Sequence, residues 1–159
     1  MKRALLATFI VLSLAACGDN GQPASKDKAA PASEASARTP SPAGAKVSIL
    51  EPKDGAVVKS PVTVKFGAEG VEVVPAGTDK PNSGHHHLLI DTKLEDYNAP
   101  VPAAPVPADA THIHYGKAQT EGQIELKPGK HTLQDVFADK NHIPHDPPLH
   151  SDVITITVE

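Results

Sequence analysis

The sequence is poor in aromatic residues and in sulfur. It has no tryptophan, three phenylalanines and two tyrosines, and Met1 is its only methionine. A core must therefore be built from valine, isoleucine and leucine, which favour strands. The single cysteine, Cys17, excludes an intramolecular disulfide and a cysteine-based zinc finger. Acidic residues outnumber basic ones by 19 to 15, so we expect no nucleic-acid partner.

Motifs of common enzyme classes are also missing. No glycine-rich phosphate loop occurs, and Ser83, although close to His85, has no nucleophile-elbow context. We therefore expect a protein that binds rather than catalyses.

The N-terminus has the features of an exported, lipid-anchored protein. Lys2 and Arg3 precede a short apolar run over residues 5–14, which is too short to span a bilayer. The run ends in Leu-Ala-Ala-Cys over residues 14–17, which resembles a bacterial lipobox. The resemblance implies a signal peptide over residues 1–16 and lipid on Cys17 that anchors the chain stably. Gly18, rather than aspartate, follows Cys17 and resembles an outer-membrane address, so we expect a lipoprotein facing the periplasm.

The remaining chain divides into a linker and one domain. Residues 17–45 comprise the lipidated cysteine and an Ala/Pro/Ser-rich segment without apolar periodicity, which predicts a disordered tether. From residue 46 onward, short alternating segments such as 62–66 and 153–158 are separated by turn signals, and no segment has a helical period. We predict an all-β domain over residues 46–159, an antiparallel immunoglobulin-like β-sandwich.

Histidine is the unusual feature of this domain. If residues 84–91 form a strand, His85, His87 and Leu89 share one face, while His86, Leu88 and Ile90 face inward. Residues 111–115 repeat the arrangement, with both histidines on one face. Imidazoles two residues apart on a strand can converge on one ion, so the sequence predicts a site for Zn(II) or Cu(II). The candidate ligands are His85, His87, His112, His114, His142 and His145.

Three carboxylates could support this site. Asp91 and Asp139 could accept hydrogen bonds from ligand imidazoles and fix their tautomers. Glu121 could act as a base for metal-bound water. His86, His131 and His150 are interpreted as structural or solvated histidines.

Two further interpretations of the histidines stay open. The domain could be a non-metal structural or interaction module of the cell envelope, whose histidines support loops that meet a partner. Alternatively, the imidazoles could sense pH, since ordinary imidazoles would become charged together near pH 6.5 and repel one another.

Residues 46–159 resemble a bacterial envelope family catalogued as domain of unknown function 4399. The resemblance is carried by residues 84–91, 114–121, 128–133 and 139–148, which include most of the histidines. Ala118 stands where the resemblance leads us to expect glycine. The family brings no assigned activity, so the resemblance supports the domain and the positions of its histidines without naming a ligand.

Overall fold

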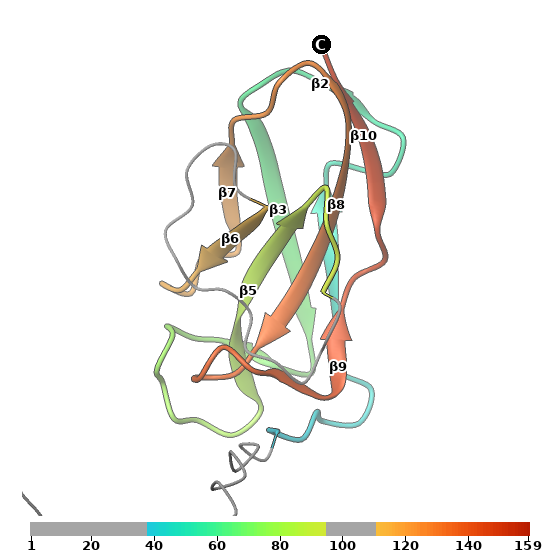
Figure 1. Cartoon of the computed structure of the whole chain (residues 1–159). Coiled ribbons are helices and arrows are strands. Elements are labelled where there is room, and N and C mark those ends of the chain that lie inside the picture. The colour runs from blue at the N-terminus through green and yellow to red at the C-terminus, as the bar shows by residue number, and fades with distance from the viewer. Residues whose placement is uncertain (1–37, 95–110) are drawn as a thin grey trace, which may run out of the picture. The chain divides into compact units, whose positions relative to one another are not determined.

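A computed structural model describes residues 38–94 and 111–159. The predicted signal peptide, Cys17 and most of the predicted tether lie outside the described residues. Within the described ranges no helix is long and apolar enough to span a membrane. The described residues form ten strands (Figure 1): β1 Lys46–Glu51, β2 Val57–Val58, β3 Val62–Glu69, β4 Glu72–Val73, β5 Ser83–Ile90, β6 His112–Tyr115, β7 Glu121–Ile124, β8 Gly129–Ala138, β9 Pro144–His150 and β10 Ile154–Val158.

The strands form two sheets. The smaller sheet has the order β1-β3-β7, and the larger has the order β2-β10-β8-β5-β4 and is curled into a half-barrel. In the larger sheet, β6 pairs with β5 and β9 pairs with β8. The all-β prediction is confirmed. The predicted antiparallel arrangement is wrong for two short pairings, because β2 lies parallel to β10 and β4 lies parallel to β5.

The main core takes side chains from both sheets. Alternating residues of β3 face strands of the larger sheet. Because aromatic residues are few, valine, isoleucine and leucine provide most of the apolar surface buried in this core. Phe66 and Tyr115 are its aromatic members and meet edge to face, with ring centroids 4.9 Å apart. The buried members of this core are Val62, Val64, Phe66, Leu88, Ile90, Tyr115, Ile124, Leu133, Ile156 and Val158.

Strand β8 fixes the position of β5. Its register with β5 runs from His85 opposite Ala138 to Ile90 opposite Leu133. The backbones come close at the start of β5, where a Cβ on Gly84 would lie 2.3 Å from the carbonyl oxygen of Ala138. Only glycine fits there, so Gly84 allows the histidines that follow it to lie directly beside β8.

Strand β9 forms in the proline-rich segment that follows β8. It contains three prolines and pairs with β8 at three positions only, with a register shift between Phe137 and Ala138. Proline cannot donate a backbone hydrogen bond, which makes a proline-rich segment a poor candidate for a strand by pattern. An edge position with irregular pairing tolerates the missing donors.

Residues 38–45, which the sequence places in the linker, make contacts with the domain. The Ser41 backbone N–H donates to the Asp146 carbonyl at 2.8 Å, and the Asp146 N–H donates to the Thr39 carbonyl at 2.9 Å. The contacts of the domain therefore begin before the predicted boundary at residue 46.

Ala118, in the turn between β6 and β7, provides a test of the fold. Its φ is 59°, in the left-handed region that favours glycine. We expect Ala118→Gly to raise the free energy of unfolding by about 0.5–1 kcal/mol, because the strain outweighs the added freedom of the unfolded chain. Urea titration measures this, and Ala68→Gly in β3 is the control, which should destabilise by a similar amount. A loss of stability in Ala118→Gly would contradict the strained turn.

Candidate metal centre

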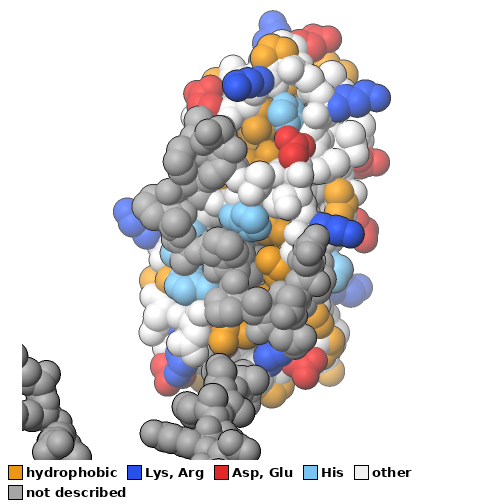
Figure 2. All heavy atoms as spheres, viewed as in Figure 1, with side chains coloured by type: hydrophobic (Ala, Val, Ile, Leu, Met, Phe, Trp, Pro, Cys, Tyr) orange, Lys and Arg blue, Asp and Glu red, His pale blue; other side chains and the backbone are white. Residues whose placement is uncertain are grey.

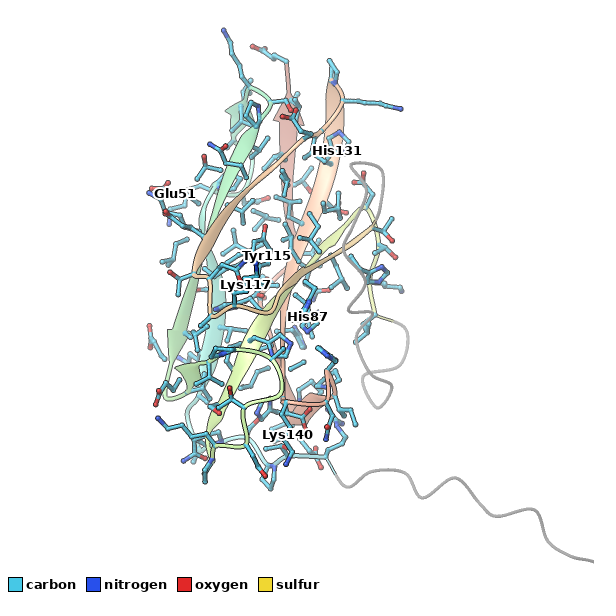
Figure 3. All side chains as sticks on the ribbon, turned by 90° about the vertical axis from the view of Figure 1, so that its left-hand side faces the viewer. Glu51, His87, Tyr115, Lys117, His131 and Lys140 are labelled. Atoms are coloured by element: carbon cyan, nitrogen blue, oxygen red, sulfur yellow. The ribbon has the colours of Figure 1, made fainter. Side chains whose placement is uncertain are left out.

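Strand β5 supplies two histidines to one face of the larger sheet. His85 and His87 point to the side away from the main core, and His86 points into that core, as the alternation predicts. All three imidazoles have 0% exposure, so β5 is buried on both faces. Figure 3 shows His87 between the end of the domain that carries His131 and the end that carries Lys140.

Strand β6 adds His114. It lies directly opposite His87 in the antiparallel register, and the two rings stack with centroids 5.0 Å apart. The next glycine makes room for the ring, because a Cβ on Gly116 would lie 2.2 Å from the His114 imidazole. The absence of a side chain at Gly116 thus leaves the space that the His114 ring occupies.

The loop between β8 and β9 adds His142. Its φ is 63°, so its backbone adopts a conformation that non-glycine residues rarely populate. Asp139 organises this loop: its Oδ1 accepts the N–H groups of Asn141 at 2.8 Å and Ile143 at 3.1 Å. The Asp139 carbonyl accepts the His142 N–H at 2.9 Å. The loop is therefore folded around one carboxylate.

The four side chains converge. One ring nitrogen from each of His85, His87, His114 and His142 lies within 4.8 Å of the others. The Nε2 atom of His85 lies 3.0 Å from Nδ1 of His142 and 3.0 Å from Nε2 of His87. We call these four residues the histidine cluster. Figure 2 shows histidine atoms reaching the surface on the face that it displays, while His114 and His142 are half-buried.

Burial keeps three imidazoles of the histidine cluster, those of His85, His87 and His114, in the neutral form. Burial first, and then repulsion from the imidazoles of His114 and His142, lowers the pKa of His85 to about 3. Burial and the neighbouring imidazoles, His85 foremost, lower the pKa of His87 to about 2. Burial and His142 also lower the pKa of His114. At neutral pH these rings carry nitrogen lone pairs that can coordinate a cation.

The converging nitrogens cannot all satisfy one another. A neutral imidazole nitrogen offers either one N–H or one lone pair, yet Nε2 of His85 faces two other ring nitrogens. Within the described residues, Nε2 of His114 is buried without a hydrogen-bond partner, and so are the Nδ1 atoms of His85 and His87, which do not belong to the close nitrogen pairs. A cation at the point of convergence would use several lone pairs at once, so this arrangement fits a metal ion.

Two predicted ligands lie outside the histidine cluster. His112 is on the same face as His114 but opposite Leu89, and its Nδ1 lies 2.9 Å from the Thr111 hydroxyl. His145 is fully buried and stacks on Phe137 with centroids 5.7 Å apart. Burial lowers the pKa of His145, and within the described residues both of its ring nitrogens are buried without a hydrogen-bond partner. Neither side chain converges with the four.

The three predicted carboxylates have other positions. Asp91 binds Nδ1 of His131 at 2.7 Å and the Thr132 N–H at 2.8 Å, and so joins the end of β5 to the start of β8. Glu121 is exposed at the start of β7. Asp139 lies near His85, where its charge partly opposes the lowering of the pKa of that histidine, but its carboxylate accepts hydrogen bonds from the loop backbone and from the Thr39 hydroxyl. Asp139 therefore shapes the loop that carries His142.

Sequence reasoning missed the partner of His86. Nδ1 of His86 lies 2.9 Å from Oδ2 of Asp135, and both side chains are fully buried in the main core. The alternation of β8 places Asp135 between Leu133 and Phe137 on the inward face. That break in an apolar stripe was the available signal, because a buried carboxylate requires a partner.

The comparisons with known proteins identify the domain. The family profile described as "Domain of unknown function (DUF4399)" matches residues 64–159. The chain belongs to this family. The match confirms the resemblance carried by the histidine motifs, and it begins in β3 of the DUF4399 domain. All four members of the histidine cluster lie within the matched residues. Comparison with curated proteins and with solved structures gives no significant match.

The lowered pKa values predict how the metal-free domain responds to acid. Unfolded histidine has a pKa of about 6.5, so between that pH and about 3 the unfolded chain binds protons that folded His85 does not, and folded His87 resists protonation to about pH 2. The free energy of unfolding should therefore fall as the pH drops below about 6.5. His87→Leu should reduce this slope by up to about 1.4 kcal/mol per pH unit, a limit approached well below the unfolded pKa, as measured by urea titration between about pH 6 and 4.

His131→Leu is the control with the opposite sign. Burial pulls the pKa of His131 down, but its hydrogen bonds to Asp91 and to the Lys127 carbonyl, with the Asp91 charge, raise it overall. Its stabilising effect is present below the unfolded pKa and is lost as the pH rises through the folded pKa, so its removal should not reduce the acid-side slope. Equal slopes in His87→Leu and the wild type would show that His87 is not a buried neutral imidazole.

Proposed function

We propose that this protein is a lipid-anchored envelope protein whose DUF4399 domain binds one Zn(II) or Cu(II) ion through the histidine cluster. The observation that carries the proposal is the convergence of four ring nitrogens within 4.8 Å of one another. They come from β5, from β6 and from the β8–β9 loop, which are brought together only by the fold.

The donor set supports these two ions. Metal–nitrogen bonds of about 2.0–2.1 Å place tetrahedral ligands about 3.3 Å apart. Two nitrogen pairs of the cluster, at 3.0 Å, are already near that separation. Imidazole suits zinc and copper, whereas the absence of a cysteine or methionine ligand in the cluster disfavours a site built for Cu(I).

The electrostatics support binding at neutral pH and below it. Protons compete with a metal for ring nitrogens, and the sequence alone predicts that binding weakens below about pH 6.5. The pKa values of His85, His87 and His114 are all lowered. Proton competition at these three ligands therefore begins at a lower pH, and binding should persist below pH 6.5.

The location and fold class complete the proposal. The lipobox-like segment over residues 14–17 supports lipidation of Cys17 and an anchor facing the periplasm, at the outer membrane. The two sheets that share one core support an immunoglobulin-like sandwich. We propose binding and not catalysis. Glu121, the residue considered as a base for metal-bound water, is exposed at the start of β7.

One observation favours an alternative, a structural histidine cluster in a non-metal interaction module. The two nitrogen pairs at 3.0 Å are within hydrogen-bond distance, so imidazoles could connect β5 to the β8–β9 loop without an ion. In that case the cluster would hold the loop for contact with a partner.

Metal titration tests the proposed site directly. The untagged chain from residue 18 to 159, titrated calorimetrically with Zn(II) and separately with Cu(II), should bind one ion per chain. His87→Ala and His114→Ala each remove a ligand and should weaken binding at least about 100-fold. His112→Ala is the matched control on the same face of β6 and should bind as the wild type does. Equal weakening in all three variants would contradict the assignment of ligands.

Thermal unfolding separates the proposal from its alternative. A ligand that binds only the folded state stabilises it by about 2.7 kcal/mol at a hundredfold excess over its Kd. Zn(II) or Cu(II) should therefore raise the Tm of the wild type and of His112→Ala, but not that of His114→Ala. If neither ion shifts the wild-type Tm, and His114→Ala lowers the Tm of the metal-free protein, the structural cluster is the better account.

A further inference from the structure

Residues 38–41, which we call the strap, lie along the outer edge of β9. Pro40 forms a parallel bridge with Asp146, and Ser41 and Thr39 exchange backbone hydrogen bonds with that residue. Arg38 donates from Nε to the Pro144 carbonyl at 2.9 Å and from its guanidinium to the His145 carbonyl. The strap is therefore joined to β9 by backbone hydrogen bonds around one isolated parallel bridge.

One side-chain contact links the strap to the loop that carries His142. The Thr39 hydroxyl donates to Oδ2 of Asp139 at 2.7 Å. The other carboxylate oxygen, Oδ1, accepts the N–H groups of Asn141 and Ile143 on either side of His142. Asp139 therefore has one oxygen bound to the strap and the other bound to the loop.

His142 is the member of the histidine cluster that can move most easily. His85, His87 and His114 lie on paired strands, whereas His142 lies on a loop of five residues between β8 and β9. Its left-handed backbone conformation costs energy and persists only while its surroundings hold it. A ligand on a short strained loop is the one whose release would open the cluster.

Solvent has access to the contact between strap and loop. A cleft of about 410 Å³ is lined by Thr39, Asp139 and Asn141 together with Thr78, Lys80 and Ser83. Water in this cleft can compete for the Asp139 carboxylate when the Thr39 hydroxyl leaves it. The contact is therefore placed where it can break and form again without disturbing the main core.

We propose that the strap controls metal release: through Thr39 and Asp139 it holds His142 in the cluster, and its detachment lets the loop move and the ion leave. This inference rests on the proposed metal site. The strap belongs to the segment that the sequence assigns to the linker, so whatever acts on that linker would act on the bound ion. Thr39 is a positioning residue in this scheme and touches no metal.

Release kinetics test the strap. The chain from residue 18 to 159 is loaded with Zn(II), mixed with an excess of a chromogenic chelator, and followed by stopped flow. Thr39→Val removes the hydroxyl and keeps the shape, and it should release zinc about tenfold faster, the factor that one hydrogen bond to a charged group supports. Thr39→Ser keeps the hydroxyl and should restore the wild-type rate. Ser41→Ala removes a strap hydroxyl that donates to the Pro147 carbonyl and not to Asp139, and it should release zinc within about twofold of the wild type.

Amide hydrogen exchange in the metal-free protein gives an independent measurement. The Asn141 and Ile143 amides, which donate to Asp139, should exchange faster in Thr39→Val and at the wild-type rate in Ser41→Ala. Equal zinc release in Thr39→Val and Ser41→Ala would overturn the strap while leaving the metal site intact. A wild-type chain that binds no zinc or copper would overturn the proposed function and metal control together, and the amide exchange would still decide whether the strap holds the loop.

Discussion

Burial of β5 on both faces is the constraint on which the rest of the domain depends. A strand with a polar face normally turns that face to water, but all eight residues of β5 are buried. Three consecutive imidazoles must therefore find partners inside the protein. The strands beside β5, the loop that carries His142 and the residues that hold this loop can all be understood as answers to that requirement.

The two faces of β5 meet the requirement in different ways. On the inner face, His86 has a carboxylate partner, Asp135, and its ring stacks on Phe66 with centroids 4.7 Å apart. On the outer face, the ring nitrogens of His85 and His87 have other imidazoles as their near neighbours. An acid and a base can satisfy each other, whereas several bases together favour a shared cation. The second face is thus the one suited to an external ligand.

Much of this arrangement could be predicted from sequence. Alternation separates His86 from His85 and His87, because a period of two follows from extended backbone geometry. The same rule places His112 and His114 together on one face of residues 111–115. Convergence could not be predicted, because it depends on which strands are neighbours. His142 and His145 differ by three residues on one proline-rich segment, yet only the first reaches the cluster, since a left-handed turn at His142 aims its ring toward β5. Composition alone also gave no reason to place residues 38–45 against β9.

The alternation of β5 makes the domain sensitive to single-residue insertion or deletion. A shift of one position between Gly84 and the aliphatic half of the strand would turn His85 and His87 toward Phe66 and leave His86 alone on the opposite side. Asp135 could then partner only one of these two imidazoles, and the other would be left without a partner among apolar side chains. A misaligned β5 would therefore be destabilised on both faces of the sheet at once. The same histidines that suit an ion thus also favour the correct strand register.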